Sequence, residues 1–415
     1  MRNIDMEMSR RTFIQTVGLV AGGVATFPLQ VHAAKFLPRN PVLTVGVLSP
    51  RSTVVPLMGE NFVAGMKVQF TEAGWTRVNL ITVDAGLSPG RALTGAAELL
   101  AAQKVDVLAG FLNPLSQSRL LESLKKSATP FINVEGGANI PSATDEHPLI
   151  SYNSWGYWQS NQAMGQWAAS NLGKRAFIAS SRYESGYDAT HAFRAGFEAA
   201  GGVLVQSSAI HIADEKNELD ALMATIKEIK PDVVYAMYSG QGAVEFVKAY
   251  AQAGLAGVIP LAASPFMVDE VLLPAMGSAA LGIRSCLSWA PGLETPGNTA
   301  LRSAFGRATG STPDLFAMLG YETAKIITTT FTVPGRSLSH ELRSARFAGP
   351  RGEFAMNSRS GYADSPLYLR EVRPEGSGLE NAVLEKLPNL AEWQKLPNRS
   401  SNEAKSGWSN TYLCV

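Results

Sequence analysis

Short apolar runs alternate with amphipathic stretches along most of this chain. In the first series, strand-like runs at 42–48, 78–83, 105–109 and 130–134 alternate with helical patterns at 59–73, 88–100 and 113–128. Within the first helical stretch, Phe62, Met66 and Phe70 recur every fourth residue and so share one face. Alternation of this kind predicts βαβ units that build a parallel sheet.

A second series with the same pattern begins after Tyr152. Its strands are expected at 176–180, 203–209, 232–237 and 258–262, with helices at 157–171, 187–200, 218–229, 243–253 and 268–276. A third section carries a strand at 281–288, helical patterns at 298–308, 314–330 and 341–347, and short strands at 352–356 and 367–372. Two such series predict an α/β protein with two doubly wound parallel-sheet lobes.

The N-terminal segment, residues 1–33, has the pattern of an export signal. Arg10 and Arg11 precede an apolar stretch of about 14 residues, and Val31-His32-Ala33 offers small residues for cleavage. The apolar stretch is too short to span a bilayer. The arginine pair is similar to that of the twin-arginine signal, although it could also precede a membrane anchor. We therefore expect a periplasmic protein that is exported by the twin-arginine route.

Composition narrows the class of protein. The 415 residues include 36 Lys and Arg against 35 Asp and Glu; residues 1–33 hold three of the basic and two of the acidic ones, so 33 of each sign remain. This balance lacks the basic excess of a nucleic-acid-binding protein. With 46% apolar residues, the chain is not a disordered one. Two cysteines, and five histidines without an HExxH or HxH pattern, exclude a disulfide scaffold and leave little for a metal site.

Five stretches carry a resemblance to a known family. They are 105–110 followed by Asn113-Pro114, then 129–133, 186–202, 230–234 and 319–324. In this order and spacing they resemble the type I periplasmic binding proteins, in the branch that holds the Leu/Ile/Val-binding and the amide- or urea-binding proteins. The similarity extends from residue 42 to about residue 373.

The resemblance implies two lobes that are joined by three hinge crossings and close around a ligand. It places lobe 1 at 42–152 plus 290–350 and lobe 2 at 153–285 plus 351–373, with a polar, proline-interrupted tail at 374–415. The expected partners are a small-molecule ligand and the permease of an ABC importer. No nucleic acid, cofactor or metal is expected, and contact with the membrane is expected only through the permease. We expect the protein to be a monomer.

Two loops of lobe 1 are predicted to face the ligand, because ligands bind beyond the carboxyl ends of parallel strands. The loop after the third strand offers Asn113 and Ser116, which could instead cap the next helix. The loop after the fourth strand carries Glu135, Gly136 and Gly137, where amino-acid binders of the family carry Ser-Ala-Thr for the ligand carboxylate. Glu135 would repel a carboxylate and suit an ammonium, amidinium or amide group. The alternative is a surface glutamate on a glycine-rich turn.

Aromatic residues dominate the remaining candidates. Trp155 and Tyr157 stand at the first crossing, where they could stack on a flat ligand, face a cation, or pack the next helix into lobe 2. Lobe 2 and the second crossing add the other candidates: Tyr183, Ser185, Tyr238, Gln241, Phe266 and Trp289. A lining with several aromatic rings and few charges favours a flat apolar or aromatic ligand that carries a few polar groups.

Some alternatives stay open at this point. Cys286 and Cys414 could pair in an oxidising compartment, or Cys286 could be a buried free thiol. A ligand-sensing receptor that reports to a membrane signalling protein would have the same lobes. A hydrolase is disfavoured, because neither GxSxG nor GxxxxGK[ST] occurs in the sequence. The sequence therefore favours a solute-binding protein that is not an enzyme and that captures an amide, an amine or an aromatic or amino-acid-like ligand.

Overall fold

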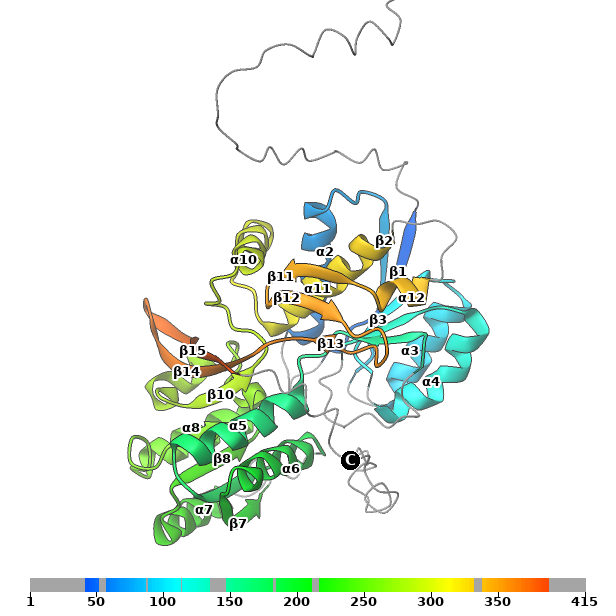
Figure 1. The fold of residues 1–415 in the computed structure, drawn as a ribbon. Coiled ribbons are helices and arrows are strands. Elements are labelled where there is room, and N and C mark those ends of the chain that lie inside the picture. The colour runs from blue at the N-terminus through cyan, green and yellow to red at the C-terminus, as the bar shows by residue number, and fades with distance from the viewer. Residues whose placement is uncertain are drawn as a thin grey trace, which may run out of the picture. The chain divides into compact units, whose positions relative to one another are not determined.

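Two sheets of mostly parallel strands form the framework of the protein (Figure 1). The computed structural model describes residues 42–51, 57–86, 89–112, 114–134, 147–181, 184–210, 216–331 and 338–387. All of these residues belong to one structural unit, which does not include residues 1–40. The export signal predicted at 1–33 therefore lies outside the described residues.

The first sheet has five parallel strands in the order β2-β1-β3-β4-β5. They are β1 (Leu43–Leu48), β2 (Val78–Val83), β3 (Val107–Gly110), β4 (Phe131–Asn133) and β5 (Ile150–Tyr152). One face is covered by α3 (Pro89–Ala101) and α4 (Pro114–Ser127), and the other by α2 (Met58–Glu72) and α11 (Leu315–Thr330). Side chains of β3 alternate between the two faces: Val107 packs in the cluster with Phe62 of α2, and Leu108 in the cluster with Leu99 of α3.

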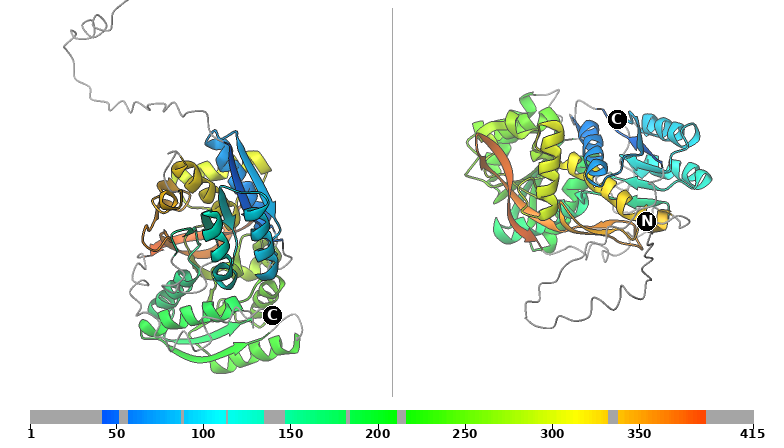
Figure 2. Two further views of the ribbon diagram at one scale, coloured as in Figure 1. Left: turned by 90° about the vertical axis from the view of Figure 1, so that its right-hand side faces the viewer. Right: turned by 90° about the horizontal axis from the view of Figure 1, so that it is seen from above.

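The second sheet has seven strands in the order β15-β14-β10-β9-β8-β6-β7. Figure 2 shows its two C-terminal strands in orange and red. Five of the seven are parallel: β6 (Arg175–Ser180), β7 (Val203–Ala209), β8 (Val233–Met237), β9 (Leu261–Ala263) and β10 (Arg284–Leu287). The edge hairpin of β14 (Leu367–Glu375) and β15 (Gly378–Leu387) pairs antiparallel to β10.

Helices also cover both faces of the second sheet. The first face carries α5 (Tyr157–Asn171) and α6 (Glu184–Ala199), and the second carries α7 (Lys216–Ile229) and α8 (Gly240–Gln252). Three short helical elements, η1 (Pro265–Val268), α9 (Leu273–Met276) and η2 (Gly277–Ala280), follow β9. Two sheets that each have helices on both faces confirm the predicted α/β fold with two doubly wound lobes.

The chain passes between the two sheets three times. It leaves the first sheet after β5 for α5, and it returns after β10 to α10 (Pro296–Thr309). After α11, α12 (Leu338–Leu342) leads into a small antiparallel sheet of β11 (Arg346–Gly349), β12 (Gly352–Met356) and β13 (Ala363–Asp364), from which the third crossing leads to β14. These passages are the three hinge crossings that the sequence predicts.

The structure differs from the sequence prediction near the C-terminus. Residues 378–387 form strand β15, although the sequence assigns them to a tail. This strand lies at the sheet edge, where only a few of its side chains are buried, so its composition is polar. For that reason the sequence pattern predicts a tail and not a strand. Residues 351–364 are assigned to lobe 2 by the sequence, yet β12 and β13 pair with β11, and Tyr362 stacks on Tyr152 at the end of β5. The third crossing therefore falls after Asp364.

One pair of helices in each lobe is in contact through glycines. A methyl group at Gly65 of α2 would lie 2.0 Å from the Ala317 carbonyl of α11, and one at Gly320 would lie 1.9 Å from the Phe62 carbonyl. The second lobe repeats this arrangement, with Gly165 of α5 against α6 and Gly196 of α6 against α5, at 2.1 and 2.0 Å from backbone oxygens. The backbones are too close for any side chain at these positions.

Candidate functional site

Three aromatic side chains stand just beyond the ends of strands. Phe111 follows β3, Trp155 follows β5, and Phe266 lies in η1 after β9. The Trp155 ring packs edge-on against Phe266 with the centroids 5.5 Å apart, and its centroid lies 5.7 Å from that of Phe316 in α11. Because Phe316 belongs to the first lobe and Phe266 to the second, Trp155 contacts both lobes at their boundary.

Further rings extend this contact in both directions. Phe316 packs against Phe111 at 6.1 Å, Phe111 packs against Phe62 of α2 at 5.1 Å, and Tyr157 stacks on Trp155 at 6.2 Å. Edge-to-face and offset-stacked pairs at these separations are favourable beyond the area that they bury. We call this set the aromatic cluster: Phe62, Phe111, Trp155, Tyr157, Phe266 and Phe316.

The indole N–H of Trp155 is a buried donor that meets no acceptor in the described part of the chain. The side chain is 9% exposed, and no hydrogen-bond acceptor among the described residues meets its Nε1. A buried polar group left in this condition costs about 1–3 kcal/mol. Trp75 of the first lobe is buried to the same extent and packs against Phe70 and Phe331. A ligand oxygen at the boundary of the lobes would satisfy the Trp155 donor.

Tyr157 is held in place from the second lobe. Its hydroxyl accepts a hydrogen bond from Ser264 Oγ at 3.4 Å, and its carbonyl accepts one from Asn161 Nδ2 at 2.7 Å. Asn161 Oδ1 in turn accepts from the Tyr235 hydroxyl at 2.6 Å. Burial, with a smaller contribution from Tyr157, raises the pKa of Tyr235 well above its usual range, so this phenol stays neutral. The network fixes the second-lobe side of the aromatic cluster.

A buried amide network holds the strand ends of the first lobe. Asn133 at the end of β4 accepts from the Leu112 N–H and donates to the Leu112 carbonyl, at 3.3 and 2.8 Å. It also donates to Gln117 Oε1 at 2.8 Å, and Gln117 donates to the Tyr152 hydroxyl at 2.6 Å. The loop between β3 and α4 is thereby fixed to β4 and β5. Ser116 lies in the first turn of α4 and is fully buried.

Several predicted ligand residues fall on parts of the chain that the structure does not describe. Asn113, Glu135, Gly136, Gly137 and Tyr183 lie outside the described residues. Ser185 lies in the first turn of α6, where only the backbone is described. These six predictions stay predictions.

The side chains of three other predicted residues make contacts within the protein. Trp289 is fully buried, and its Nε1 donates to Asn298 Oδ1 at 2.9 Å. The Tyr238 ring stacks on Phe246 of α8 with the centroids 4.6 Å apart. This contact lies on the face of the second sheet that α7 and α8 cover, opposite to α5. The buried Tyr238 hydroxyl has no partner among the described residues. Gln241 is exposed and donates to Glu245 at 3.1 Å. Trp289 nevertheless lies in the same buried apolar core as Trp155 and Tyr157, whereas Tyr238 lies in a different one.

Three members of the aromatic cluster are absent from the predicted ligand residues: Phe62, Phe111 and Phe316. Phe111 directly follows β3 and lies two residues after the predicted strand 105–109, so its position near a strand end was a usable signal. Phe316 lies in the first turn of α11, where the periodic apolar pattern of the helix hides it among core residues. Asp314 caps α11 and accepts from the Ala317 N–H at 2.8 Å, so it marks where the helix begins. Because Phe316 lies in the first turn after this cap, the cap was a usable signal that Phe316 stands at the end of the helix.

A buried arginine connects the hinge crossings beside this site. Arg351, next to β12, donates to the Ser154 carbonyl at 2.9 Å and to Asn153 Oδ1 at 2.6 Å, both on the first crossing. It also donates to Ser288 Oγ on the second crossing at 3.3 Å, and to Glu322 Oε2 of α11 at 2.8 Å. The first crossing, which carries Trp155, is therefore linked to the second crossing and to α11 through a single side chain.

Among the described residues, no group of three or more His, Cys, Asp or Glu side chains has the arrangement of a metal site. None of the described helices combines the length and the apolar character that crossing a membrane requires.

Comparison with known proteins agrees with this architecture. A family model described as a periplasmic binding protein matches residues 42–378. A Brucella melitensis protein named Leu/Ile/Val-binding protein homolog 6 is 27% identical over 370 residues, which cover 86% of this chain and 93% of that protein.

Solved structures give the same result. An ABC transporter substrate-binding protein from Sphaerobacter thermophilus has a TM-score of 0.75 and 26% identity, with 84% of this chain and 98% of that chain covered. A solute-binding protein of an ABC transporter from R. palustris in complex with benzoate has a TM-score of 0.71 and 27% identity, with 83% and 98% covered. Another, from Rhodopseudomonas palustris HaA2 in complex with p-hydroxybenzoic acid, has a TM-score of 0.75 and 25% identity, with 85% and 98% covered. Because the family model spans most of the chain, this protein belongs to the periplasmic binding protein family, as a solute-binding protein of an ABC transporter.

Proposed function

We propose that this protein captures a planar aromatic ligand that bears a carboxylate or another hydrogen-bond acceptor, and delivers it to an ABC importer. The observation that carries the proposal is the buried indole N–H of Trp155, which has no acceptor among the described residues while rings from both lobes surround it. An aromatic ring is the ligand shape that such a lining favours, and an acceptor atom would satisfy the donor.

The similar proteins support this ligand class over an aliphatic one. Two structures that are at least 25% identical hold benzoate and p-hydroxybenzoic acid. The Brucella relatives are named for leucine, isoleucine and valine, so branched-chain amino acids are the competing ligands. An aliphatic side chain would gain less from the edge and face contacts of Phe266 and Phe316 than a ring of similar size.

The proposed contacts come from both lobes. Trp155, Tyr157 and Phe266 are the predicted residues that pack together, and Phe111 and Phe316 join them from the first lobe. The remaining polar contacts are proposed to come from the loop residues Asn113, Glu135, Gly136, Gly137 and Tyr183 and from Ser116 and Ser185 in the first turns of α4 and α6.

A carboxylate next to Glu135 would be repelled, as the sequence predicts, unless the ligand points its acceptor toward Trp155 instead. The amide benzamide therefore belongs in any ligand panel together with benzoate, because it has the same ring and an acceptor but no charge. We further propose that the protein reaches the periplasm by the twin-arginine route and acts there as a monomer.

The test is a binding panel of benzoate, 4-hydroxybenzoate, benzamide, leucine and valine, measured by calorimetry and by thermal shift. Stabilisation by a ligand grows with its concentration relative to Kd, so a true ligand raises Tm progressively. We expect at least one aromatic compound to bind and the two amino acids not to bind. Trp155→Phe keeps a ring but removes the N–H, and should weaken aromatic binding by about 10- to 100-fold, the range for a hydrogen bond to a charged acceptor.

Trp75→Phe is the matched control, because Trp75 is equally buried and packs against Phe70 and Phe331, away from the aromatic cluster. It should leave aromatic binding unchanged. Tight binding of leucine or valine without aromatic binding, or equal effects of the two substitutions, would refute the proposal.

A further inference from the structure

Acidic side chains from both lobes meet beside the aromatic cluster. Asp269 follows η1 in the second lobe, three residues after Phe266, and Asp314 caps α11 in the first lobe, two residues before Phe316. Both residues are buried, with exposed fractions of 7% and 4%, and the two carboxylates repel one another. Asn61 of α2, which is adjacent to Phe62, donates to Asp314 Oδ2 at 2.7 Å.

The charges around this pair do not balance. Glu270 adds a third carboxylate, which accepts from Asn381 of β15 at 2.8 Å and repels both aspartates. The one cation close to the pair among the described residues is Arg370 of β14, whose Nη1 lies 3.9 Å from Glu270 Oε1. Arg370 is itself 1% exposed and donates to Ser285 Oγ and to the Trp289 carbonyl, at 3.0 and 3.2 Å. Glu380 of β15 also faces Glu270, and Arg302 of α10 lies near Glu380.

Three carboxylates with one arginine leave excess negative charge in a buried position. Burial is the main cause that raises the pKa of Asp314 to about 6, and the hydrogen bonds from Asn61 and from the Ala317 N–H limit that rise. Burial, followed by repulsion from Glu270 and Asp314, raises the pKa of Asp269 well above its usual range. If the lobes separated, water would reach a pair that spans their boundary, and each carboxyl would approach an ordinary value of about 3.9.

We propose that closure of the two lobes around the ligand takes up a proton on the Asp269–Asp314 carboxyl pair. The proton comes from solvent, binds one carboxylate oxygen and breaks no bond. It removes one negative charge from a place where two carboxylates from different lobes are buried together. Ligand capture is therefore linked to pH, and the closed form is favoured as the pH falls.

The direction follows from proton linkage. A group that binds its proton more tightly in the closed state favours closure below its closed-state pKa, and this advantage is lost as the pH rises through that value. Asp314 supplies the linkage below about pH 6, and Asp269 adds to it because its pKa is also raised well above the usual range. Uptake of one proton makes the ligand Kd rise by up to about tenfold for each pH unit.

Two measurements test the proposal. The first is calorimetry with benzoate at pH 6.5 in two buffers of different ionisation enthalpy, which counts protons taken up per ligand. Wild-type protein should take up close to one proton, and Asp269→Asn, which can still accept from the Val271 N–H, should take up almost none. Asp106→Asn is the control: it removes a carboxylate that accepts from the Thr44 N–H outside this cluster, and should behave as wild type.

The second measurement needs no ligand and so separates this proposal from the proposed function, on which the calorimetry rests. Spin labels at Glu98→Cys on α3 and Lys227→Cys on α7, both exposed positions, report the distance between the lobes in a Cys414→Ser background. The population with the shorter distance should grow as the pH falls from 8 to 5.5, and Asp269→Asn should remove the part of that change above about pH 6, leaving only the part that Asp314 supplies. Distances independent of pH, or the same pH response in Asp269→Asn, would overturn the proposal even if benzoate binds.

Discussion

Arg351 and Glu322 form an ion pair that solvent does not reach. The Nε of Arg351 donates to Glu322 Oε2 at 2.8 Å, and the two side chains are 1% and 0% exposed. Because the same guanidinium also donates to Ser154 and Ser288, the pair joins α11 to the first and second hinge crossings. A buried pair of this kind contributes little net stability, but breaking it leaves an uncompensated charge.

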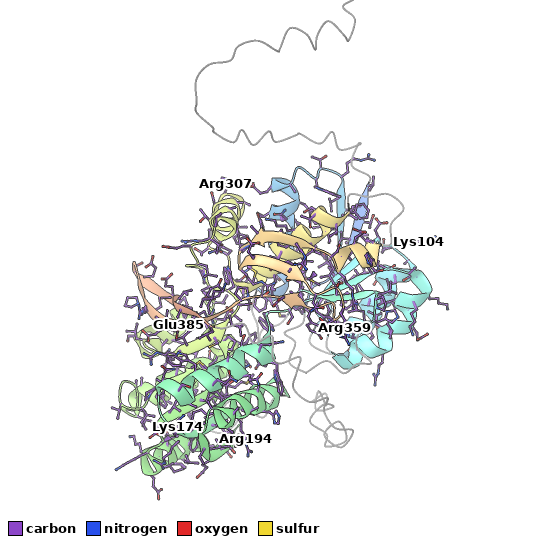
Figure 3. All side chains as sticks on the ribbon, in the orientation of Figure 1. Lys104, Lys174, Arg194, Arg307, Arg359 and Glu385 are labelled. Carbon is purple, nitrogen blue, oxygen red and sulfur yellow. The ribbon has the colours of Figure 1, made fainter. Side chains whose placement is uncertain are left out.

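Glu322→Gln should therefore destabilise the protein strongly. The glutamine keeps the shape of the side chain but leaves the Arg351 charge buried without a counter-ion, at a cost of about 3–5 kcal/mol. Urea unfolding measures this loss. Glu198→Gln is the control, because Glu198 pairs with Arg194, four residues earlier on α6, where both side chains are exposed and such a pair contributes about 0.5 kcal/mol or less. Figure 3 labels Arg194. Equal losses in the two variants would contradict the role of the buried pair.

Gly320→Ala should also destabilise the protein, for a steric reason. The new methyl group would lie 1.9 Å from the Phe62 carbonyl, so α2 and α11 would have to separate. Overpacking of this kind costs about 1–3 kcal/mol, or more where backbone must move. Gly306→Ala in α10 is the opposite case: the nearest atom is 3.8 Å away, and replacing a helical glycine should stabilise by about 0.5–1 kcal/mol. Tm changes of the same sign in both variants would refute this explanation.

The alternation of strand and helix was sufficient to predict the parallel strands of both sheets except the short strand β5. Buried parallel strands such as β8, in which every residue is buried, appear in the sequence as continuous apolar runs, so their positions are well marked. The edge hairpin was harder to predict. Strand β15 buries only Asn381 and Leu387. Asn381 is a polar residue, and in its buried position it donates a hydrogen bond to the Val268 carbonyl. A strand without an apolar run carries no signal that separates it from a polar tail.

The candidate site was predicted in part, for a related reason. Trp155 and Tyr157 stand out because two large aromatics at a crossing are unusual, and both belong to the aromatic cluster. Trp289 and Tyr238 stand out in the same way, yet the Trp289 indole donates to Asn298 and the Tyr238 ring stacks on Phe246 of α8. Position at a strand end decides which loop a residue occupies, but the direction of its side chain depends on packing that the sequence does not encode locally.

Tyr238→Phe should test which of these roles Tyr238 has. Its buried hydroxyl has no partner among the described residues, and burial raises the pKa of this phenol, so it stays neutral. Because the ring stacks on Phe246 and belongs to the core, the substitution should leave benzoate binding unchanged. Removing an unsatisfied hydroxyl should raise the stability of the ligand-free protein by up to about 1 kcal/mol. Calorimetry that shows weaker binding, together with unchanged Tm, would instead assign the hydroxyl to the ligand.

Cys286 should not react with thiol reagents while the protein is folded. It is fully buried in β10 and lies 3.8 Å from the Met164 sulfur, and burial raises the pKa of its thiol far above the usual range. The thiolate is the reactive form, so both access and ionisation disfavour modification. Iodoacetamide treatment at pH 8 followed by peptide mass spectrometry should find Cys286 unmodified in native protein and alkylated after denaturation. Alkylation in the native state would show that the second crossing opens, whereas a Cys286–Cys414 disulfide in protein purified without reductant would contradict the free thiol.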